Sequence, residues 1–216
     1  MPFLYYGAHP FCELFMSLVT RRRVIGKKNI PDSGPLIVVA NHLNNADPPI
    51  LGLSVWPREM AFMAKEELFR NPLLRAILRG VGAFPVNRGR FDREALRKAR
   101  EVLQNGTLLG LFPEGKRSKT GAMEEAMPGP ALMARHFKSP ILPVGIYGTE
   151  KARGGFWFFR RPRVTITIGI PFDLPGSGHA SKDDLKNDTD FIMRKIAELI
   201  PEQYRGVYGD HTRRAN

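Results

Sequence analysis

The sequence predicts a single α/β domain with a central mixed β-sheet flanked by helices and preceded by an N-terminal amphipathic helix. Short runs of β-branched and aliphatic residues alternate along the chain with longer segments in which apolar residues recur every three to four positions. Such alternation is typical of strands joined by crossover helices. The chain has 216 residues, which fits one domain, and 43% of them are hydrophobic, enough for a sizeable core.

The first expected element is an amphipathic helix that begins at Pro10 and ends at Arg21–Arg23. It either packs its apolar side on the core, or lies in a membrane interface with aromatic rings in lipid and arginines at the phosphates. The sequence leaves both interpretations open. The apolar residues with helical spacing are Phe11, Leu14, Phe15, Leu18 and Val19.

Five further elements are expected before residue 90. Asp47 followed by Pro48 suits an N-cap with proline at the first helical position. The helix expected at 66–78 carries an apolar stripe beside a basic one, so it either packs with a solvated face or offers a second membrane-facing surface. In order, the elements are a strand at 36–40, a helix at 48–55, a strand at 61–64, the helix at 66–78 and an extended segment at 80–88.

The second half of the chain continues the alternation. A charged helix is expected at 92–105, because Gly106 is a suitable C-terminal stop. Residues 154–163 interleave aromatic residues with arginines, a composition that suits a membrane interface and equally suits stacking on nucleotide bases. The remaining expected elements are strands at 107–112, 141–147 and 164–169 and helices at 130–137 and 184–199.

The charge of the chain indicates an anionic partner. The formal net charge is +12 and the pI is near 10.2, which suits nucleic acid, anionic lipid or a phosphorylated substrate. The single cysteine, Cys12, excludes an intramolecular disulfide and suits a reducing compartment. Met1–Ala8 lacks the basic region of a secretory signal, and no apolar run approaches the roughly 20 residues that cross a bilayer. We therefore expect a protein in the cytosol or on the cytosolic face of a membrane.

A histidine and an aspartate, His42 and Asp47, follow the first buried strand at a five-residue spacing. On an α-helix five residues rotate by about 500°, which would turn the two side chains away from each other. A contact between them therefore needs a strand end followed by a loop, and the flanking residues predict both. His42 would then lie at the carboxyl end of a strand, a usual place for sites in open α/β sheets. Alone, the pair also suits a capping aspartate near a surface histidine.

A second polar cluster follows the strand expected at 107–112. Glu114 and Gly115 stand beside Lys116 and Arg117. Glycine allows backbone N–H groups to approach a ligand, and the cations neutralise charge. The cluster therefore suits an anion or polyol site, and otherwise is an ordinary basic turn.

Four blocks, in order, resemble the motifs of the glycerolipid acyltransferase family, which includes bacterial 1-acylglycerol-3-phosphate acyltransferases. The likeness runs from about residue 10 to 175 and includes Lys65–Phe69 between the first two blocks. Two positions depart from the family pattern. Lys116 stands where threonine is frequent, and Met127 replaces a more usual basic residue. The blocks are Asn41-His42-x4-Asp47 for the H-x4-D motif, Gly82–Arg88 for the segment that ends in a substrate-binding arginine, Phe112-Pro113-Glu114-Gly115 for FPEG, and Ile141–Val144 for the proline block.

This resemblance implies acyl transfer from acyl-CoA or acyl-carrier protein to the free hydroxyl of 1-acylglycerol 3-phosphate, giving phosphatidic acid in phospholipid biosynthesis. It implies that His42 removes the hydroxyl proton and that Asp47 orients the imidazole and stabilises its charged form. No metal is expected, and no cofactor apart from the acyl-donor substrate. The acceptor-binding residues that it implies are Arg88, Glu114, Gly115, Lys116 and Arg117, of which the first would hold the phosphate.

Together with the charge, the resemblance implies a peripheral or monotopic protein on the cytosolic face of the cell membrane. Residues 1–23 would be the membrane-interfacial segment and residues 24–216 the acyltransferase domain. The expected partners are a lysophospholipid, the acyl donor and an anionic membrane surface, without nucleic acid. Two alternatives remain. One is an acyltransferase for another acceptor, such as glycerol 3-phosphate or a glycolipid. The other is a basic nucleic-acid-binding protein, which would account for the charge but not for the four ordered motifs.

Overall fold

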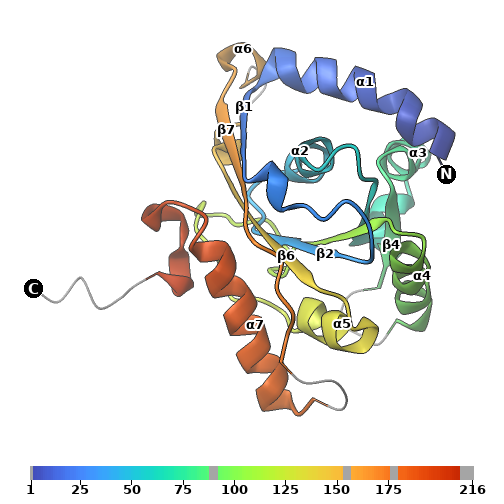
Figure 1. Cartoon of the computed structure of the whole chain (residues 1–216). Coiled ribbons are helices and arrows are strands. Elements are labelled where there is room, and N and C mark those ends of the chain that lie inside the picture. The colour runs from blue at the N-terminus through green and yellow to red at the C-terminus, as the bar shows by residue number, and fades with distance from the viewer. Residues whose placement is uncertain (1, 88–91, 153–156, 176–179, 210–216) are drawn as a thin grey trace, which may run out of the picture.

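The computed structural model describes residues 2–87, 92–152, 157–175 and 180–209, and a seven-stranded sheet forms its centre (Figure 1). Neighbouring strands run in the order β1-β7-β6-β2-β5-β3-β4, and each pair is parallel except β6 with β7. The predicted α/β class with a mixed sheet is therefore confirmed. The strands are β1 (Arg21–Ile25), β2 (Ile37–Ala40), β3 (Met60–Lys65), β4 (Ala83–Val86), β5 (Leu108–Leu111), β6 (Ile141–Tyr147) and β7 (Arg163–Ile168).

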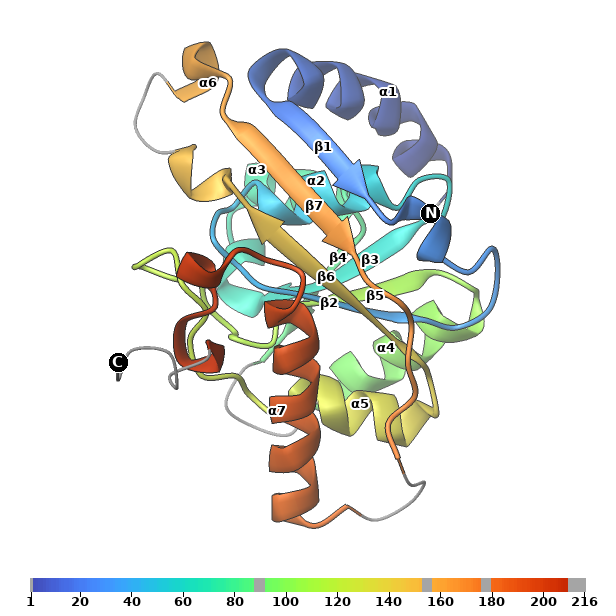
Figure 2. The ribbon, with the colours of Figure 1, turned by 60° about the vertical axis from the view of Figure 1, so that its left-hand side comes forward.

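Helices cover both faces of this sheet. They are α1 (Pro2–Val19), α2 (Asp47–Ser54), α3 (Pro72–Gly80), α4 (Arg93–Gln104), α5 (Gly129–Phe137), α6 (Trp157–Arg160) and α7 (Lys182–Ala197). On one face lie α1, α2 and α3, and on the other lie α4, α5 and α7 (Figure 1). The short helix α6 lies beside α1, as the turned view also shows (Figure 2).

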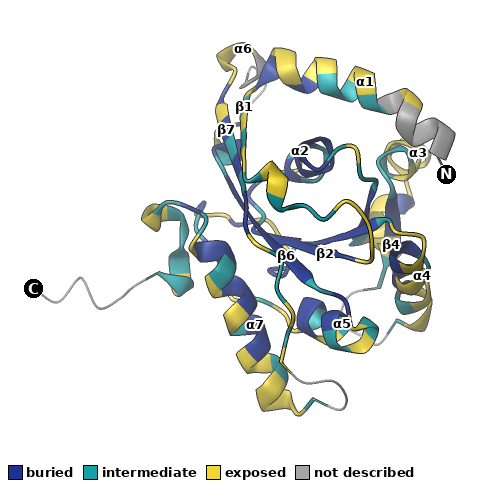
Figure 3. Ribbon diagram, viewed as in Figure 1, coloured by how far each residue is buried: buried dark blue, intermediate teal, exposed yellow. Residues whose placement is uncertain are grey.

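Two hydrophobic cores, one on each face, hold the layers together, and the central strands are buried between them (Figure 3). In β2, Val38 and Ala40 belong to the core under α1 and α2, whereas Ile37 and Val39 belong to the core under α4, α5 and α7. A strand that is buried on both faces has a continuous apolar run rather than an alternating one. That is why the sequence predicts this strand so clearly.

Helix α1 packs one side on the core, as one of the two interpretations predicts, and leaves its other side exposed. Met16 and Val19 are buried in the core. The rest of the expected apolar stripe is exposed: Phe11 by 76%, Leu14 by 62%, Phe15 by 57% and Leu18 by 61%. The helix begins at Pro2 rather than at Pro10, which lies inside it. Across the part of the chain that the structure describes, none of the helices combines the length and the apolar character needed to span a membrane.

Strand β1 corrects the interpretation of Arg21–Arg23 as the end of the helix. These arginines lie in the strand, which pairs in parallel with β7 at the edge of the sheet. Only Val24 and Ile25 of its five residues are apolar, so the local pattern is too weak to predict a strand, and pairing with β7 decides the conformation. An ion pair between Arg22 and Glu13 ties the strand to α1.

The prediction of one continuous helix at 66–78 is also wrong. Residues Glu66–Phe69 form a 3₁₀ turn and α3 begins at Pro72, because proline disrupts a helix interior but fits the first helical turn. The side chain of Asn71 caps α3 by accepting the N–H of Leu74 at 3.0 Å. The other predicted strands and helices are confirmed, with ends within three residues of those expected.

Candidate active site

Two neighbouring parallel strands end at one place, and the residues that follow them meet there. His42 comes after β2 and Glu114 comes after β5. From these ends the chain leaves toward opposite faces of the sheet, to α2 in one case and to α5 in the other (Figure 1). Adjacent strand ends with diverging connections form the crevice in which open α/β sheets bind ligands. His42 therefore lies where the sequence predicts it.

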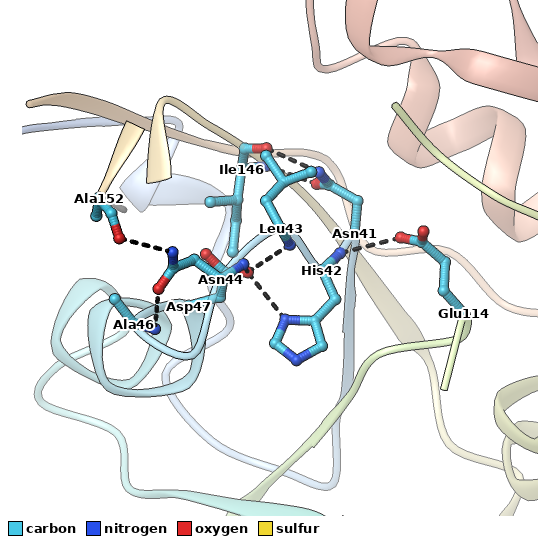
Figure 4. A network of polar contacts seen from close by, with 9 residues as sticks. All are labelled: Asn41, His42, Leu43, Asn44, Ala46, Asp47, Glu114, Ile146 and Ala152. Carbon is cyan, nitrogen blue, oxygen red and sulfur yellow. Dashed lines mark hydrogen bonds and ion pairs between the residues drawn. The ribbon is translucent and has the colours of Figure 1, made fainter. Parts of the chain in front are cut away.

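The side chains of His42 and Asp47 contact each other, as their spacing predicts. Nδ1 of His42 lies 2.9 Å from Oδ2 of Asp47, and the same oxygen accepts the N–H groups of Leu43 at 2.6 Å and Asn44 at 2.7 Å (Figure 4). Asp47 is fully buried and is the first residue of α2 rather than its N-cap, because its carboxylate is engaged by the preceding loop. An ionised carboxylate only accepts hydrogen bonds, so the proton of the neutral imidazole is on Nδ1 and the lone pair is on Nε2.

Further contacts fix the ring and the end of β2. The ring of Phe112 stacks on the imidazole of His42, with centroids 4.2 Å apart and 24° between the planes. The side chain of Asn41 exchanges two hydrogen bonds with the backbone of Ile146 in β6, each at 2.8 Å. The strand end that carries the histidine is thereby attached to the strands on both of its sides.

The loop after β5 holds the backbone of His42. Oε1 of Glu114 accepts the N–H of His42 at 3.0 Å, and the N–H of Ser118 donates to the carbonyl oxygen of His42 at 2.8 Å. Oε2 of Glu114 accepts the N–H of Glu124 at 3.1 Å. The residue Glu114 is only 3% exposed, and this burial raises the pKa of its carboxyl group to about 7, although both hydrogen bonds favour the ionised form.

A tight turn shapes the start of this loop. The N–H of Gly115 donates to the carbonyl oxygen of Phe112 at 3.0 Å, which closes the turn, and Pro113 stands at its second position. Gly115 has a φ of +66°, which glycine adopts without strain. A Cβ added at this position would lie 2.8 Å from Sδ of Met127. The positive φ is therefore the reason for glycine here, because the flexible side chain of Met127 can move away from an added Cβ.

Of the three cationic residues predicted for the site, the structure describes Lys116 and Arg117. Lys116 and Arg117 follow the turn and are exposed. The ammonium of Lys116 lies 2.6 Å from a carboxylate oxygen of Glu124, and this hydrogen bond raises the pKa of Lys116. Arg88 lies outside the described residues. Among the residues that the structure describes, no group of three or more His, Cys, Asp or Glu side chains is placed to hold a metal ion.

The structure thus joins His42, Asp47 and Glu114 in one hydrogen-bonded network and puts the remaining predicted residues from 115 to 117 on the adjoining loop. Sequence reasoning missed the parts played by Asn41 and Ser118. Asn41 stands directly before the histidine, but an asparagine there gives no sign of a partner more than 100 positions away. Ser118 acts through its backbone N–H, which no sequence pattern can indicate.

The chain is similar to several known proteins. Residues 21–147 match the family model described as Acyltransferase. A 1-acyl-sn-glycerol-3-phosphate acyltransferase of Bacillus subtilis (strain 168) is 27% identical over 196 residues, which are 88% of this chain and 96% of that protein. A protein of the same name from Streptococcus pneumoniae is 29% identical over 170 residues, and the match spans 59% of its length.

A solved structure is also similar. The crystal structure of the 1-acyl-sn-glycerophosphate (LPA) acyltransferase PlsC from Thermotoga maritima matches with a TM-score of 0.68 and 31% sequence identity, over 90% of this chain and 79% of that chain. The family model spans more than half of the chain and includes both His42 with Asp47 and the turn at Glu114. The protein therefore belongs to the acyltransferase family and is an enzyme of that family.

Proposed function

We propose that the enzyme transfers an acyl chain from acyl-CoA or acyl-carrier protein to the free hydroxyl of 1-acylglycerol 3-phosphate, giving phosphatidic acid in phospholipid biosynthesis. The names of the relatives from Bacillus subtilis and Thermotoga maritima support this acceptor. The observation that carries the proposal is the buried carboxylate of Asp47 on Nδ1 of His42, because it leaves Nε2 ready to accept a proton.

In the proposed mechanism His42 is the general base. Its Nε2 removes the proton of the acceptor hydroxyl while the hydroxyl oxygen attacks the carbonyl carbon of the thioester. The C–O bond forms, the C–S bond breaks, and the leaving thiolate takes the proton from the imidazolium. The products are phosphatidic acid and a free thiol on CoA or the carrier protein. Asp47 stabilises the imidazolium between these steps, as in a catalytic triad whose nucleophile is supplied by the substrate.

The acceptor phosphate requires cations close to the base. Arg88 would hold the phosphate through a bidentate contact, which a planar guanidinium suits better than an ammonium. Lys116 and Arg117 would add positive charge from the loop that contacts the backbone of His42, and Gly115 would let the backbone approach the glycerol. The ion pair between Lys116 and Glu124 leaves Arg117 as the less neutralised cation of the two.

The exposed side of α1 supports a peripheral or monotopic enzyme on the cytosolic face of the cell membrane. Both substrates carry acyl chains, and moving a chain from lipid into water costs about 0.8 kcal/mol for each CH₂. A site open to the membrane interface avoids that cost. The sequence suggested that Arg21–Arg23 meet lipid phosphates, but Arg22 and Val24 face α1, so Arg21 and Arg23 extend from the other face of β1. Each cation near an anionic surface would add about 1 kcal/mol. Residues 1–23 would then be the interfacial segment of an acyltransferase domain at 24–216, although β1 crosses that boundary.

Helix α3 extends the exposed apolar surface of α1, which it contacts. Its side chains Leu73 and Ile77 are exposed by 72% and 55%. The basic residues Arg75 and Arg79 lie on the same helix and are exposed as well. Apolar side chains with cations on one short helix are typical of a membrane-interfacial element, so the second membrane-facing surface suggested by the sequence is part of the same proposal.

Mass spectrometry of lipid products tests the reaction. The purified enzyme is incubated with acyl-CoA or acyl-carrier protein and with a panel of acceptors that includes 1-acylglycerol 3-phosphate, glycerol 3-phosphate and a glycolipid. Phosphatidic acid formed from 1-acylglycerol 3-phosphate is the expected product. Comparison of the reactions with acyl-CoA and with acyl-carrier protein shows which donor the enzyme uses. Product from another acceptor alone would overturn the proposed substrate. An enzyme that is inactive with the whole panel and binds DNA in a salt-sensitive way would favour the nucleic-acid-binding alternative.

A further inference from the structure

The five-residue segment 114–118 carries both groups that hold the backbone of His42. Glu114 at its start accepts the N–H of His42, and Ser118 at its end donates to the carbonyl oxygen of His42. The two cations proposed for the acceptor, Lys116 and Arg117, lie between them in the sequence. One short loop therefore holds the backbone of the base and carries two of the cations proposed for the acceptor phosphate.

We infer that Glu114 is a positioning residue, which fixes His42 through its backbone N–H instead of binding the acceptor. The inference rests on the proposed function in one respect, namely that His42 is the base. It competes with the acceptor-binding role that the family resemblance implies for Glu114.

The geometry of Glu114 favours positioning over acceptor binding. Its side chain is buried, and each carboxylate oxygen accepts a backbone N–H, from His42 at 3.0 Å and from Glu124 at 3.1 Å. Figure 4 shows Glu114 on the opposite side of His42 from Asp47. Because Glu114 is almost fully buried, its oxygens are shielded from an acceptor that enters from solvent, and the charge of the carboxylate would repel the acceptor phosphate.

The far end of the segment is fixed as firmly as its start. The hydroxyl of Ser118 accepts the N–H of Gly121 at 3.0 Å and donates to the carbonyl oxygen of Ala122 at 2.7 Å. Ser118 is also buried. Removal of Glu114 would therefore free the N–H side of His42 while its carbonyl side stays attached, and the imidazole would tilt. A displacement of about 1 Å can cost about 10²-fold in rate.

Steady-state kinetics of the enzyme test the inference, with 1-acylglycerol 3-phosphate varied at saturating acyl donor. Glu114→Ala removes both acceptor oxygens, and Glu114→Gln keeps one. We expect kcat to fall by about 10²-fold in the alanine variant and by less in the glutamine variant, while KM for the acceptor changes by less than about twofold. Glu125→Gln is the matched control, because Glu125 is exposed on the same loop, and it should keep the wild-type kcat. A raised KM with unchanged kcat would overturn the inference.

A measurement on the wild-type enzyme decides the case if the Glu114 variants do not fold. In a pH titration followed by NMR, the backbone amide resonances of His42 and Glu124, which both donate to this carboxylate, should move with the same apparent pKa as the side-chain carboxyl carbon of Glu114. An amide resonance that does not respond to that titration would overturn the inference. This experiment needs no turnover, so a failure of the proposed acceptor would not be mistaken for a failure of the positioning role.

Discussion

Nδ1 of His42 lies 2.9 Å from Oδ2 of Asp47, an oxygen that also accepts the N–H groups of the two residues after the histidine. One carboxylate oxygen therefore sets the tautomer of the ring and the shape of the loop that presents it. If an asparagine at position 47 turned its amide nitrogen toward the loop, that nitrogen could not accept the N–H groups of Leu43 and Asn44, because it is itself a donor. Replacing Asp47 is accordingly expected to disturb both the base and its support.

The first prediction concerns this pair. His42→Ala should abolish acyl transfer and leave the fold intact, because the hydrogen bonds of its backbone do not involve the ring. Asp47→Asn should lower kcat by about 10²- to 10⁴-fold. Initial rates and thermal melting are measured together, with His136→Ala on the exposed side of α5 as the control that keeps full activity. An unchanged kcat in folded His42→Ala enzyme would remove the mechanism.

For Arg88→Ala the expected result is a higher KM for the phosphorylated acceptor, with KM for the acyl donor less affected, because a charge-assisted bidentate contact is lost. Kinetics with each substrate varied in turn measure the two constants. Arg97→Ala, which removes an exposed arginine of α4, controls for the loss of positive charge alone. If KM for the acceptor does not change, the phosphate is held elsewhere, and Lys116 with Arg117 become the residues to test.

The buried carboxyl of Glu114 predicts a particular dependence of stability on pH. Its pKa is raised from 4.5 to about 7, chiefly by burial, so the folded protein holds this proton more tightly than the unfolded chain does. The free energy of unfolding should therefore fall as the pH rises from 4.5 to 7 and then level off. Glu114→Gln removes this contribution. Denaturant unfolding between pH 5 and 8 gives the free energy of unfolding of the wild type and of Glu114→Gln. If this free energy changes equally with pH in both proteins, the pH dependence comes from other groups.

Gly115→Ala should destabilise the turn at the site. An L-residue in the left-handed region costs about 1–2 kcal/mol, and the added Cβ would lie 2.8 Å from Sδ of Met127. Urea unfolding measures the loss, and kcat should fall with it because the turn leads into the segment that holds His42. Gly129→Ala is the matched control, since a Cβ there meets nothing within 4 Å. Equal effects of the two substitutions would contradict the role of the turn.

The sequence predicted the elements whose pattern is local and missed those that depend on a distant partner. The run at 36–40 is apolar throughout because β2 is buried on both faces, so it could be found without the fold. Strand β1 has three arginines and exists only because β7 lies beside it. In the site, too, local features could be predicted and contacts between distant residues could not. The spacing of His42 and Asp47 restricts their geometry, whereas the hydrogen bond from His42 to Glu114 spans 72 positions and leaves no local sign.

The last prediction is that α1 anchors the enzyme to anionic membranes. Deleting residues 1–23 would be a poor test, because it also removes the buried side chains of α1 and most of β1, and so should destabilise the fold in any case. Phe11→Ser with Phe15→Ser changes only exposed positions and removes a large part of the apolar face. We expect this double variant to melt like the wild type and to bind anionic vesicles at least about 10-fold more weakly, because two aromatic rings no longer enter the lipid.

The matched control for that variant is Leu132→Ser with Val207→Ser, which removes two exposed apolar side chains from α5 and from the turn Gly206–Tyr208 beside α7. Co-sedimentation with vesicles of phosphatidylglycerol and phosphatidylcholine compares the three proteins. The control should bind as the wild type does, because its substitutions lie on the face of the sheet opposite α1 and α3, which would face away from the lipid. If the α1 variant and the control bind equally tightly, α1 is not the anchor, and the exposed apolar residues of α3 are the next to be replaced.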